Sequence, residues 1–490
     1  MRRWRGQLKS YRFLLYWALF LICYMVLTNE VQAAEQESVS YSEHKVIYEG
    51  KSFTIQYIEV DLKDPGIKVT PLLAEGGIGH VEEFDQMIRR SGAIAAVNGT
   101  FFNAYEQDSG IRYPNGLMIA DGRAIHSGIN QTLAIGLDKK AVIEHWEMSL
   151  KAHVFHEGQN IYSFTPWSVN KYFGAEAHDQ VNWYSPEFGK QHIDYPGGSK
   201  IVICEGKIVE ITEDEAQIPE NGAVLFIGHA KGNIEYLLPH LQVGVDIQLE
   251  AALQRNTNGQ SGSSDWLSAI GVGPKLITAG RIDIDPERDG FNDPKITSLA
   301  AVRSFVGINH EGKMVMGTTS AATLSQMGHI LLDLGLVEAM NMDGGASSAL
   351  YVNGKFVRPS GRPLSNAWIV QKLEQPQVQI FVNGQYVHDY RGYINGNTTM
   401  APFRGIFERL EADFEWDNET RTLTAWKDNI QLILRPDDQT AYVNGESVTL
   451  DSAPVIIDGH IYIPLRFVTE ALGATVEWDS ELYRASIIVP

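Results

Sequence analysis

Short apolar runs separated by glycine and asparagine dominate residues 46–372. β-Branched residues are enriched in these runs, and few stretches place apolar residues at helical spacing. The pattern predicts a sheet-dominated α+β fold for this part of the chain. The clearest strand candidates are residues 54–60, 93–97, 200–203, 224–227 and 304–308.

One stretch has a strong helical pattern. Residues 323–334 place apolar side chains three or four positions apart, which predicts an amphipathic helix. A strand is expected next, over residues 338–342, and it leads into Asp343 and two glycines that begin a sharp turn. Segments with asparagine and glycine at 309–312 and 352–355 predict hairpin turns.

The pattern changes after residue 374, where an internal repeat appears at an offset of about 62 residues. Its clearest sign is a Glu-Trp-Asp triplet that occurs once around Trp416 and again around Trp478. We expect residues 376–490 to form a small α+β module of two copies. Each copy is predicted as a hairpin, a short helix and a second hairpin, with its tryptophan in the core.

The two copies also share a proline-led segment, at Pro402 in the first and Pro464 in the second. Helices are predicted directly after these prolines, over 403–410 and 465–472. With the Glu-Trp-Asp triplets, these segments resemble the copper amine oxidase N-terminal-like domain.

The histidines of the module argue against a copper site. His388 and His460 stand alone, without a second histidine at ligand spacing. Two interpretations of the module stay open. It is a stalk or spacer, or it binds polysaccharide and attaches the protein to the cell wall.

The first 33 residues have the pattern of an export signal. A basic start precedes an apolar run from Phe13 to Leu27, and small residues surround Ala33. We therefore predict a signal peptide over residues 1–33 and a secreted or envelope-associated protein. An uncleaved signal anchor is the alternative, although the run is shorter than the roughly 20 residues that span a bilayer.

Composition and charge narrow the function classes. The chain has 490 residues, of which 44% are hydrophobic, so it is long enough for about three compact units with cores of their own. Forty basic against sixty acidic residues give a net charge of −20, which argues against nucleic-acid binding. The two cysteines, Cys23 and Cys204, exclude a disulfide framework and a thiolate zinc site.

The first candidate site segment follows the predicted strand over 93–97. It places Asn98, Gly99 and Phe101 at the strand end. Polar groups and bare backbone at such ends commonly contact ligands. A turn with two phenylalanines in the core is the alternative.

The second segment centres on Arg303, beside a predicted buried strand. A guanidinium in this position suits a phosphate or another oxyanion, which it holds by forked hydrogen bonds. A structural ion pair with one of the sixty acids explains the residue equally well.

The third segment closes the predicted strand over 338–342. It brings a carboxylate, hydroxyls and flexible backbone amides together, and further polar residues follow shortly downstream. This combination suits proton transfer with anion contacts. Its candidate residues are Asp343, Gly344, Gly345, Ser347, Arg362 and Asn366.

In their order along the chain, these segments resemble the phosphodiester glycosidase family over roughly residues 75–370. Further matching motifs begin at Pro114, Tyr184 and Gly271. One departure concerns residues 317–320, Gly-Thr-Thr-Ser, where many relatives have an acidic or basic residue. The departure bears on substrate choice.

The resemblance implies hydrolysis of a sugar joined through its anomeric carbon to a phosphodiester, with release of free sugar and a phosphomonoester. The expected substrate is a glycosyl phosphate or a cell-wall polymer. We expect Asp343 to assist water or the oxocarbenium-like centre, Arg303 to hold the phosphate, and Asn98 and Asn366 to orient the substrate. Contacts are also expected from Gly99, Phe101, Gly344, Gly345, Ser347 and Arg362.

Two other functions fit the same segments. A non-catalytic protein would bind the polymer without turnover, and a phosphodiesterase would break the bond on the phosphorus side. An acidic chain repels a polyanionic substrate at long range. For any of these functions on a polyanion we therefore expect a local basic patch, which we place around Arg303 and Arg362.

No resident cofactor is expected. An acidic loop over residues 283–293 loosely resembles a calcium loop, but its glycine, Gly290, is not at the sixth position that an EF-hand requires. A solvated acidic loop is the favoured interpretation. The acids of this loop are Asp283, Asp285, Glu287, Asp289 and Asp293.

Overall fold

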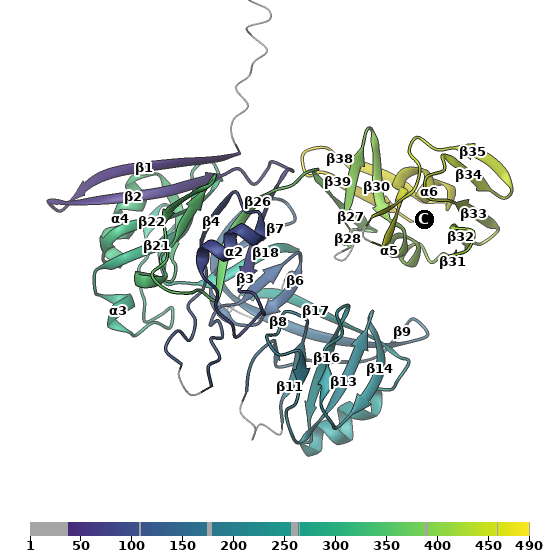
Figure 1. Cartoon of the computed structure of the whole chain (residues 1–490), viewed down its shortest axis with the longest axis horizontal. Helices are drawn as coiled ribbons and strands as arrows, with labels where there is room; N and C mark the ends of the chain where they lie inside the picture. Colours follow the sequence, from purple (N-terminus) through teal and green to yellow (C-terminus); the bar gives the residue numbers. More distant parts are fainter. Residues whose placement is uncertain are drawn as a thin grey trace, which may run out of the picture.

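The computed structural model describes residues 38–106, 109–173, 179–255, 263, 265–387, 391–457 and 459–489. The predicted signal peptide and His388 lie outside the described residues. Figure 1 shows three parts: a sandwich of two sheets, a lobe formed by one end of a long sheet, and a C-terminal module. Within the described ranges, no helix has the length and apolar character needed to cross a bilayer.

Strands dominate the described residues and helices are short, which confirms the predicted sheet-dominated α+β fold. The five clearest strand predictions are also confirmed, with ends shifted by up to three residues. The corresponding strands are β2 (Lys51–Val60), β4 (Ala95–Asn98), β13 (Gly198–Cys204), β16 (Gly222–Gly228) and β21 (Ala301–Asn309).

One half of the sandwich is a seven-stranded sheet, in which β21 pairs with strands on both sides. The sheet order is β1-β2-β22-β21-β23-β19-β20. The strands not yet given are β1 (Val39–Tyr48), β19 (Lys275–Thr278), β20 (Arg281–Ile282), β22 (Met314–Ala322) and β23 (Leu336–Asn341).

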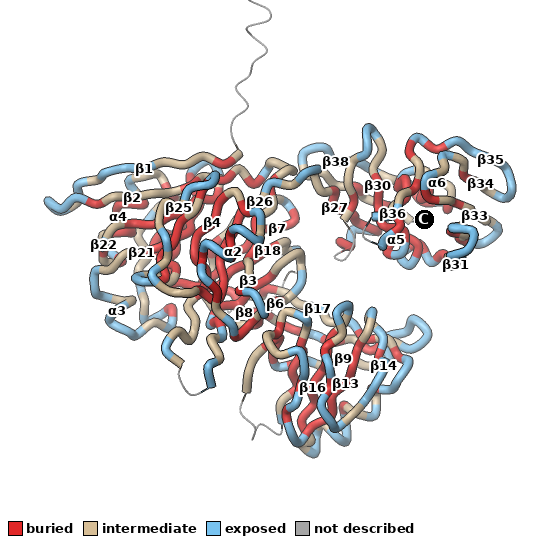
Figure 2. Tube along the Cα trace, in the orientation of Figure 1, coloured by how far each residue is buried: buried red, intermediate tan, exposed pale blue. Residues whose placement is uncertain are grey.

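The other half is a five-stranded sheet with β4 at its centre, in the order β25-β24-β4-β26-β3. Its other strands are β3 (Ile67–Leu73), β24 (Leu350–Val352), β25 (Lys355–Arg358) and β26 (Asn366–Lys372). The two sheets share a buried core, and Figure 2 shows burial concentrated in β4, β21 and β26. Val306 and Met316 face Val97 and Trp368 in this core.

Short helices cover the outer faces of the sandwich. Helix α2 (Phe84–Ser91) packs on the five-stranded sheet and α4 (Leu324–Asp333) on the seven-stranded sheet. The α4 prediction is confirmed, because Thr323 is the N-cap: its hydroxyl accepts from the Gln326 N–H at 3.2 Å, and Gln326 caps in return. A four-residue helix, α3 (Pro294–Thr297), precedes β21.

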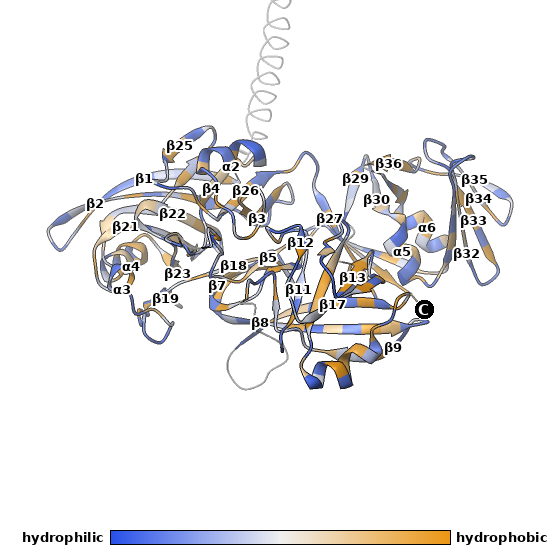
Figure 3. Ribbon diagram, turned by 60° about the horizontal axis from the view of Figure 1, so that its bottom comes forward, coloured by the Kyte–Doolittle hydropathy of each residue, from blue (hydrophilic) through white to orange (hydrophobic). Residues whose placement is uncertain are grey.

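A long sheet joins the sandwich to the lobe. Its longest strand, β8 (Ala141–His156), pairs with β7 (Ile129–Gly136) near the sandwich and with β17 (Asp246–Arg255) in the lobe. Figure 3 shows apolar positions along β13, inside the lobe. The remaining strands of this sheet are β5 (Met118–Ala120), β6 (Arg123–His126), β9 (Gln159–Phe164), β10 (Ser168–Val169), β11 (Val181–Tyr184), β14 (Lys207–Thr212) and β18 (Trp266–Val272). The lobe also holds the pair β12 (His192–Ile193) and β15 (Ala216–Gln217), a π-helix (Asn233–Leu237) and a 3-10 turn (Leu238–His240).

The C-terminal module has a core of its own and two sheets, to which both repeats contribute. The predicted helices are confirmed as α5 (Phe403–Arg409) and α6 (Leu465–Ala471). One sheet has the order β36 (Val455–Ile457), β37 (His460–Pro464), β30 (Thr398–Pro402), β29 (Gly392–Asn395), β27 (Gln377–Val382), β39 (Arg484–Ile488) and β38 (Thr475–Asp479), with β28 (Gln385–Tyr386) beside β27. The other has the order β31 (Asp413–Asp417), β32 (Thr422–Lys427), β33 (Ile430–Leu434), β34 (Thr440–Val443) and β35 (Glu446–Thr449).

The two repeat tryptophans differ in burial, which corrects one expectation. Trp416 packs against the module core, whereas Trp478 is 39% exposed and forms an edge-type ring contact with Tyr483, 5.7 Å away between centroids. The prediction that Trp478 lies in the core is therefore wrong. The first and last strands of the module, β27 and β39, pair in parallel, so the two repeats are interleaved.

Specific contacts hold the module against the rest of the protein. Asp121 at the β5–β6 turn bonds Arg391 at 2.6 Å and Lys68 at 2.8 Å. Phe381 and Leu137 belong to one apolar cluster at the same junction. The C-terminal module therefore packs against the rest of the protein through an ion-pair network and an apolar cluster.

Candidate active site

Asp343 lies two residues after the end of β23, at the start of a tight turn. The Gly344 N–H donates to its Oδ1 at 2.9 Å, and the Ser347 side chain also bonds the carboxylate. Burial raises the pKa of Asp343 to about 6, although these bonds and the Arg362 charge lower it. A carboxyl group with a pKa near neutrality is suited to proton transfer.

Glycine is required twice in this turn. Gly345 has a φ of +62°, in the left-handed region that favours glycine. A Cβ on Gly344 would lie 3.0 Å from the Val302 carbonyl oxygen and 3.8 Å from Cδ of Arg303. The turn therefore packs directly on the strand that carries Arg303.

Asn98 fixes the position of this turn from the other sheet. It is 1% exposed, and its Nδ2 donates to the Asp343 carbonyl at 2.7 Å. Its Oδ1 accepts from the Ser304 hydroxyl at 2.6 Å and from the Ala349 N–H at 3.1 Å. The structure thus places Asn98 as a clamp between β4, β21 and the turn, and not at an open surface where it would orient a substrate.

Asn366 has a similar structural placement. Its Oδ1 accepts from the Thr100 N–H at 2.9 Å, and its Nδ2 donates to the Thr100 hydroxyl at 2.8 Å. A Cβ on Gly99 would lie 1.8 Å from that Oδ1, which explains why glycine stands there. Phe101 packs against the sandwich core and the ring of Phe291, so its placement fits the core alternative.

Arg303 is 2% exposed and donates only to backbone carbonyls. Its Nε bonds Ala322, and one terminal nitrogen bonds Leu299 at 2.6 Å and Lys295 at 3.4 Å. Burial lowers the pKa of Arg303 from its ordinary value. Within the described ranges it forms no ion pair, and its second terminal nitrogen has no hydrogen-bond partner, so the structural ion pair considered from the sequence is not formed there.

Arg362 is the guanidinium whose charge acts on Asp343. It donates to the Tyr105 hydroxyl at 3.1 Å, and its Cζ lies 5.1 Å from the centre of the Tyr105 ring. Lys295 lies on the same ring, with Nζ 5.9 Å from its centre. Tyr105 and Lys295 carry no sequence motif, and only the folded chain brings them together.

We call Asp343, Ser347, Arg303 and Arg362 the Asp343 cluster. Asn98 holds its turn through the Asp343 carbonyl, Gly344 and Gly345 form that turn, and Gly99 packs against Asn366, which bonds Thr100. A further arginine missed from the sequence, Arg358, donates to the Thr318 hydroxyl at 3.2 Å in the segment that departs from the family pattern. Thr318 pairs with Ser304 and Thr319 with Arg303, so Arg358 and Arg303 approach opposite faces of the sheet.

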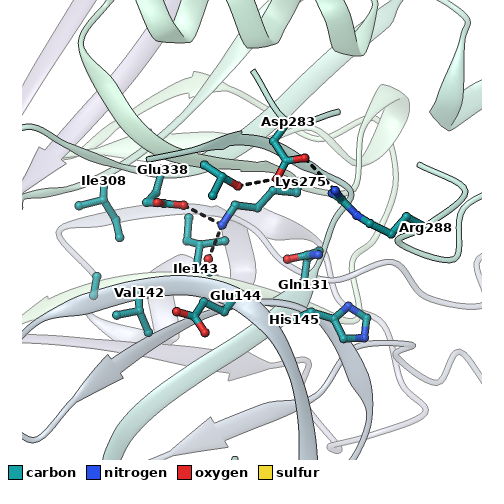
Figure 4. A pocket seen from close by; sticks show the side chains of 12 residues that line it. Gln131, Val142, Ile143, Glu144, His145, Lys275, Asp283, Arg288, Ile308 and Glu338 are labelled. Carbon is teal, nitrogen blue, oxygen red and sulfur yellow. Dashed lines mark hydrogen bonds and ion pairs between the residues drawn. The ribbon is translucent and has the colours of Figure 1, made fainter. Parts of the chain in front are cut away.

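A cavity of about 360 Å³ lies elsewhere, between β8 and the β19–β23 pair. We call it the Lys275 cavity (Figure 4). The ammonium of Lys275, a buried residue, lies 2.7 Å from Glu338 and also donates to the Ile143 carbonyl. Glu338 precedes Asp343 by five positions along the chain, which is at most about 16 Å at 3.3 Å per extended residue.

The acidic loop borders this cavity, and its carboxylates are engaged by the protein itself. Asp283 pairs with Arg288 at 2.7 Å, and Asp289 accepts from Gln131 at 2.9 Å and from the Lys275 N–H at 2.8 Å. In the part of the chain that the structure describes, no group of three or more His, Cys, Asp or Glu side chains has the arrangement of a metal site. A calcium site in this loop stays an untested alternative.

Two family models match the chain. Residues 198–371 match Phosphodiester glycosidase, and residues 381–487 match Copper amine oxidase N-terminal domain. Among curated proteins, a protease inhibitor from Brevibacillus choshinensis is 26% identical over 111 residues, which are 22% of this chain and 34% of that protein. The chain thus spans about a third of that relative.

Solved structures with similar folds include two bacterial proteins. A Synechocystis protein described as hypothetical has a TM-score of 0.55 and 19% identity, over 68% of this chain and 62% of that one. A Burkholderia pseudomallei K96243 protein, named for its expected export, has a TM-score of 0.51 and 18% identity, over 65% of this chain and 74% of that one. These two matches show a shared fold.

The catalytic domain of zebrafish N-acetylglucosamine-1-phosphodiester α-N-acetylglucosaminidase matches 69% of this chain and 85% of its own, with a TM-score of 0.35 and 13% identity. Asp343, Arg303 and Arg362 all lie inside the segment that matches the glycosidase family model, whereas Asn98 and Tyr105 lie outside it. The Asp343 cluster thus lies in the segment that matches the Phosphodiester glycosidase model, and the segment that matches the Copper amine oxidase N-terminal domain model follows it.

Proposed function

We propose that the protein hydrolyses the glycosyl bond of a sugar-1-phosphodiester and releases free sugar and a phosphomonoester. One observation carries the proposal. In the family-matched segment, a carboxyl group whose pKa burial raises to about 6 lies near the guanidinium of Arg362, and neither Arg362 nor Arg303 forms an ion pair with a described carboxylate. A proton-transfer group beside free cations suits a reaction at a phosphate ester.

The chemistry needs few groups, because a phosphodiester leaving group is already a weak base. Departure of the phosphate therefore demands less help from a general acid than departure of an alkoxide. In the proposal, ionised Asp343 activates water or stabilises the positive anomeric centre, and the free terminal nitrogen of Arg303 binds the phosphate. Asn98 positions the Asp343 turn, Asn366 fixes the backbone at Thr100, and neither contacts the substrate in the proposal.

The reaction is tested by incubating the purified protein with a glycosyl phosphodiester and assaying reducing sugar and phosphomonoester. Hydrolysis in ¹⁸O-labelled water identifies the bond that breaks. Label in the sugar supports cleavage at the anomeric carbon, whereas label in the phosphate shows a phosphodiesterase. If the protein binds the substrate without cleaving it, the hydrolysis is excluded and the non-catalytic binding function is supported.

We also propose that the protein acts outside the membrane and contacts wall polysaccharide through its C-terminal module. The exposed ring of Trp478 beside Tyr483 supports this role, because sugar rings stack on accessible aromatic faces. Co-sedimentation with purified cell wall tests it. Both proteins keep the packed Trp416, so the comparison isolates Trp478. Equal sedimentation of the wild type and Trp478→Ala would contradict the role of this tryptophan.

A further inference from the structure

Tyr105 presents an exposed ring beside two cations. It is 74% exposed, and its ring lies near both the guanidinium of Arg362 and the ammonium of Lys295. An aromatic ring with cations on it is held by cation–π attraction, which orders all three side chains. We call Tyr105, Lys295 and Arg362 the Tyr105 surface.

The three residues are held by backbone contacts of separate segments. The Tyr105 loop is closed at its base, where the Asn103 N–H donates to the Tyr113 carbonyl at 3.0 Å. Lys295 lies in α3, where the Asp293 side chain caps its N–H at 2.9 Å. The carbonyl of Lys295 accepts from Arg303 at 3.4 Å, so the Tyr105 surface adjoins the Asp343 cluster directly.

The cations of this surface form no ion pair with a described residue. Among the described residues, neither Lys295 nor Arg362 forms an ion pair, and Arg303 behind them has none either. The whole chain, in contrast, is acidic, with sixty acidic and forty basic residues. Two adjacent cations that form no ion pair favour an anion with more than one charge.

We propose that the Tyr105 surface is a second anion subsite and that the substrate is a chain of sugar phosphates. The phosphate at the scissile bond lies at the Asp343 cluster, and the next phosphate of the acceptor lies between Lys295 and Arg362. This inference rests on the proposed function and specifies its substrate. Tyr105 stands outside the segment that matches the glycosidase model, whereas Lys295 and Arg362 lie inside it.

The test compares two synthetic substrates with the same sugar. One is a glycosyl methyl phosphodiester, and the other has a second phosphate on its acceptor. For Lys295→Ala we expect KM for the second substrate to rise about fivefold, the effect of one charge contact near water, with kcat unchanged. KM for the methyl diester should not change, and Lys51→Ala, which removes an exposed lysine of β2, is the matched control.

Equal KM values of the two substrates in the wild type, or equal effects of Lys295→Ala on both, would overturn the subsite while leaving the hydrolysis intact. If neither substrate is cleaved, the proposed hydrolysis fails. The subsite is then decided by calorimetry with the two-phosphate compound. Binding about fivefold weaker in Lys295→Ala than in the wild type supports an anion subsite, and equal binding excludes it.

Discussion

The Asp343 cluster and the Lys275 cavity both gather charged residues, but they differ in how the charges are paired. In the cavity, Lys275 faces Glu338 and Arg288 faces Asp283, so each charge meets an opposite charge within 4 Å (Figure 4). In the cluster, Arg303 and Arg362 have no described ion-pair partner. In these two regions, the open volume contains a structural ion network, whereas the cations of the candidate site form no ion pair with a described residue.

The largest expected effect concerns the carboxyl group of the cluster. Asp343→Asn keeps the bond from the Gly344 N–H but removes the ionisable group, so kcat should fall by about 10²- to 10⁴-fold. The rate of sugar release measures it. Asp333→Asn, at an exposed position of α4, is the control and should keep wild-type activity. Normal turnover by a folded Asp343→Asn protein would remove the proposed role.

Substitutions in the Lys275 cavity should change the free energy of unfolding and leave kcat unchanged. Glu338→Leu leaves the buried ammonium of Lys275 without its carboxylate, which should lower the free energy of unfolding by about 3 kcal/mol. Adding Lys275→Met should recover at least half of the loss, because no buried charge then remains. Chemical denaturation measures both variants. A loss of kcat in the double variant at a temperature where it is folded would show that the cavity takes part in the reaction.

The raised pKa of Asp343 predicts that turnover increases and the free energy of unfolding decreases as the pH rises. Ionised Asp343 is the active form in the proposal, so kcat should fall about tenfold per pH unit below pH 6. Because its pKa in the folded protein is raised, this carboxyl favours folding when protonated, and that stability is lost as the pH rises from about 4 to about 6. At pH 8, Asp343→Asn should therefore unfold at a higher temperature than the wild type, with a free energy of unfolding that is larger by at most about 3 kcal/mol. At pH 3.5 the free energy of unfolding should show no gain. A loss of stability at pH 8 would contradict a raised pKa.

The sequence predicted most of the strands and the helix that position the Asp343 cluster. Hydrophobic periodicity located β2, β21 and α4, since strands and amphipathic helices leave regular patterns. Asp343 was selected because a carboxylate, hydroxyls and flexible amides come together there, and Arg303 because a guanidinium beside a buried strand suits an oxyanion. Both lie at strand ends that the structure places side by side, as the Gly344 contact with Arg303 shows.

The sequence could not predict which polar side chains stay free. Asn98 and Asn366 stand at strand ends like the other candidates, yet their amides are engaged by neighbours more than 200 positions away in the chain. Tyr105 and Lys295 meet across about 190 positions through loop packing, which leaves no periodic pattern. For Trp478, the repeat predicted the strand but not its burial, because burial depends on how the copies interleave.

The smallest expected effect is the salt dependence of substrate binding. If unpaired cations attract an anionic substrate, raising the ionic strength from about 0.05 to about 0.3 M should increase KM about two- to threefold, since screening shortens the reach of exposed charges. Arg362→Gln should raise KM at low salt and flatten this dependence, whereas Arg466→Gln, at an exposed position of the C-terminal module, should do neither. The paired charges of the Lys275 cavity predict the opposite behaviour for stability: its buried ion pair is poorly screened, so the unfolding loss in Glu338→Leu should be the same at both salt concentrations. A KM that does not respond to salt would remove the contrast between the two regions, because the arginines of the cluster would then behave as neutralised charges.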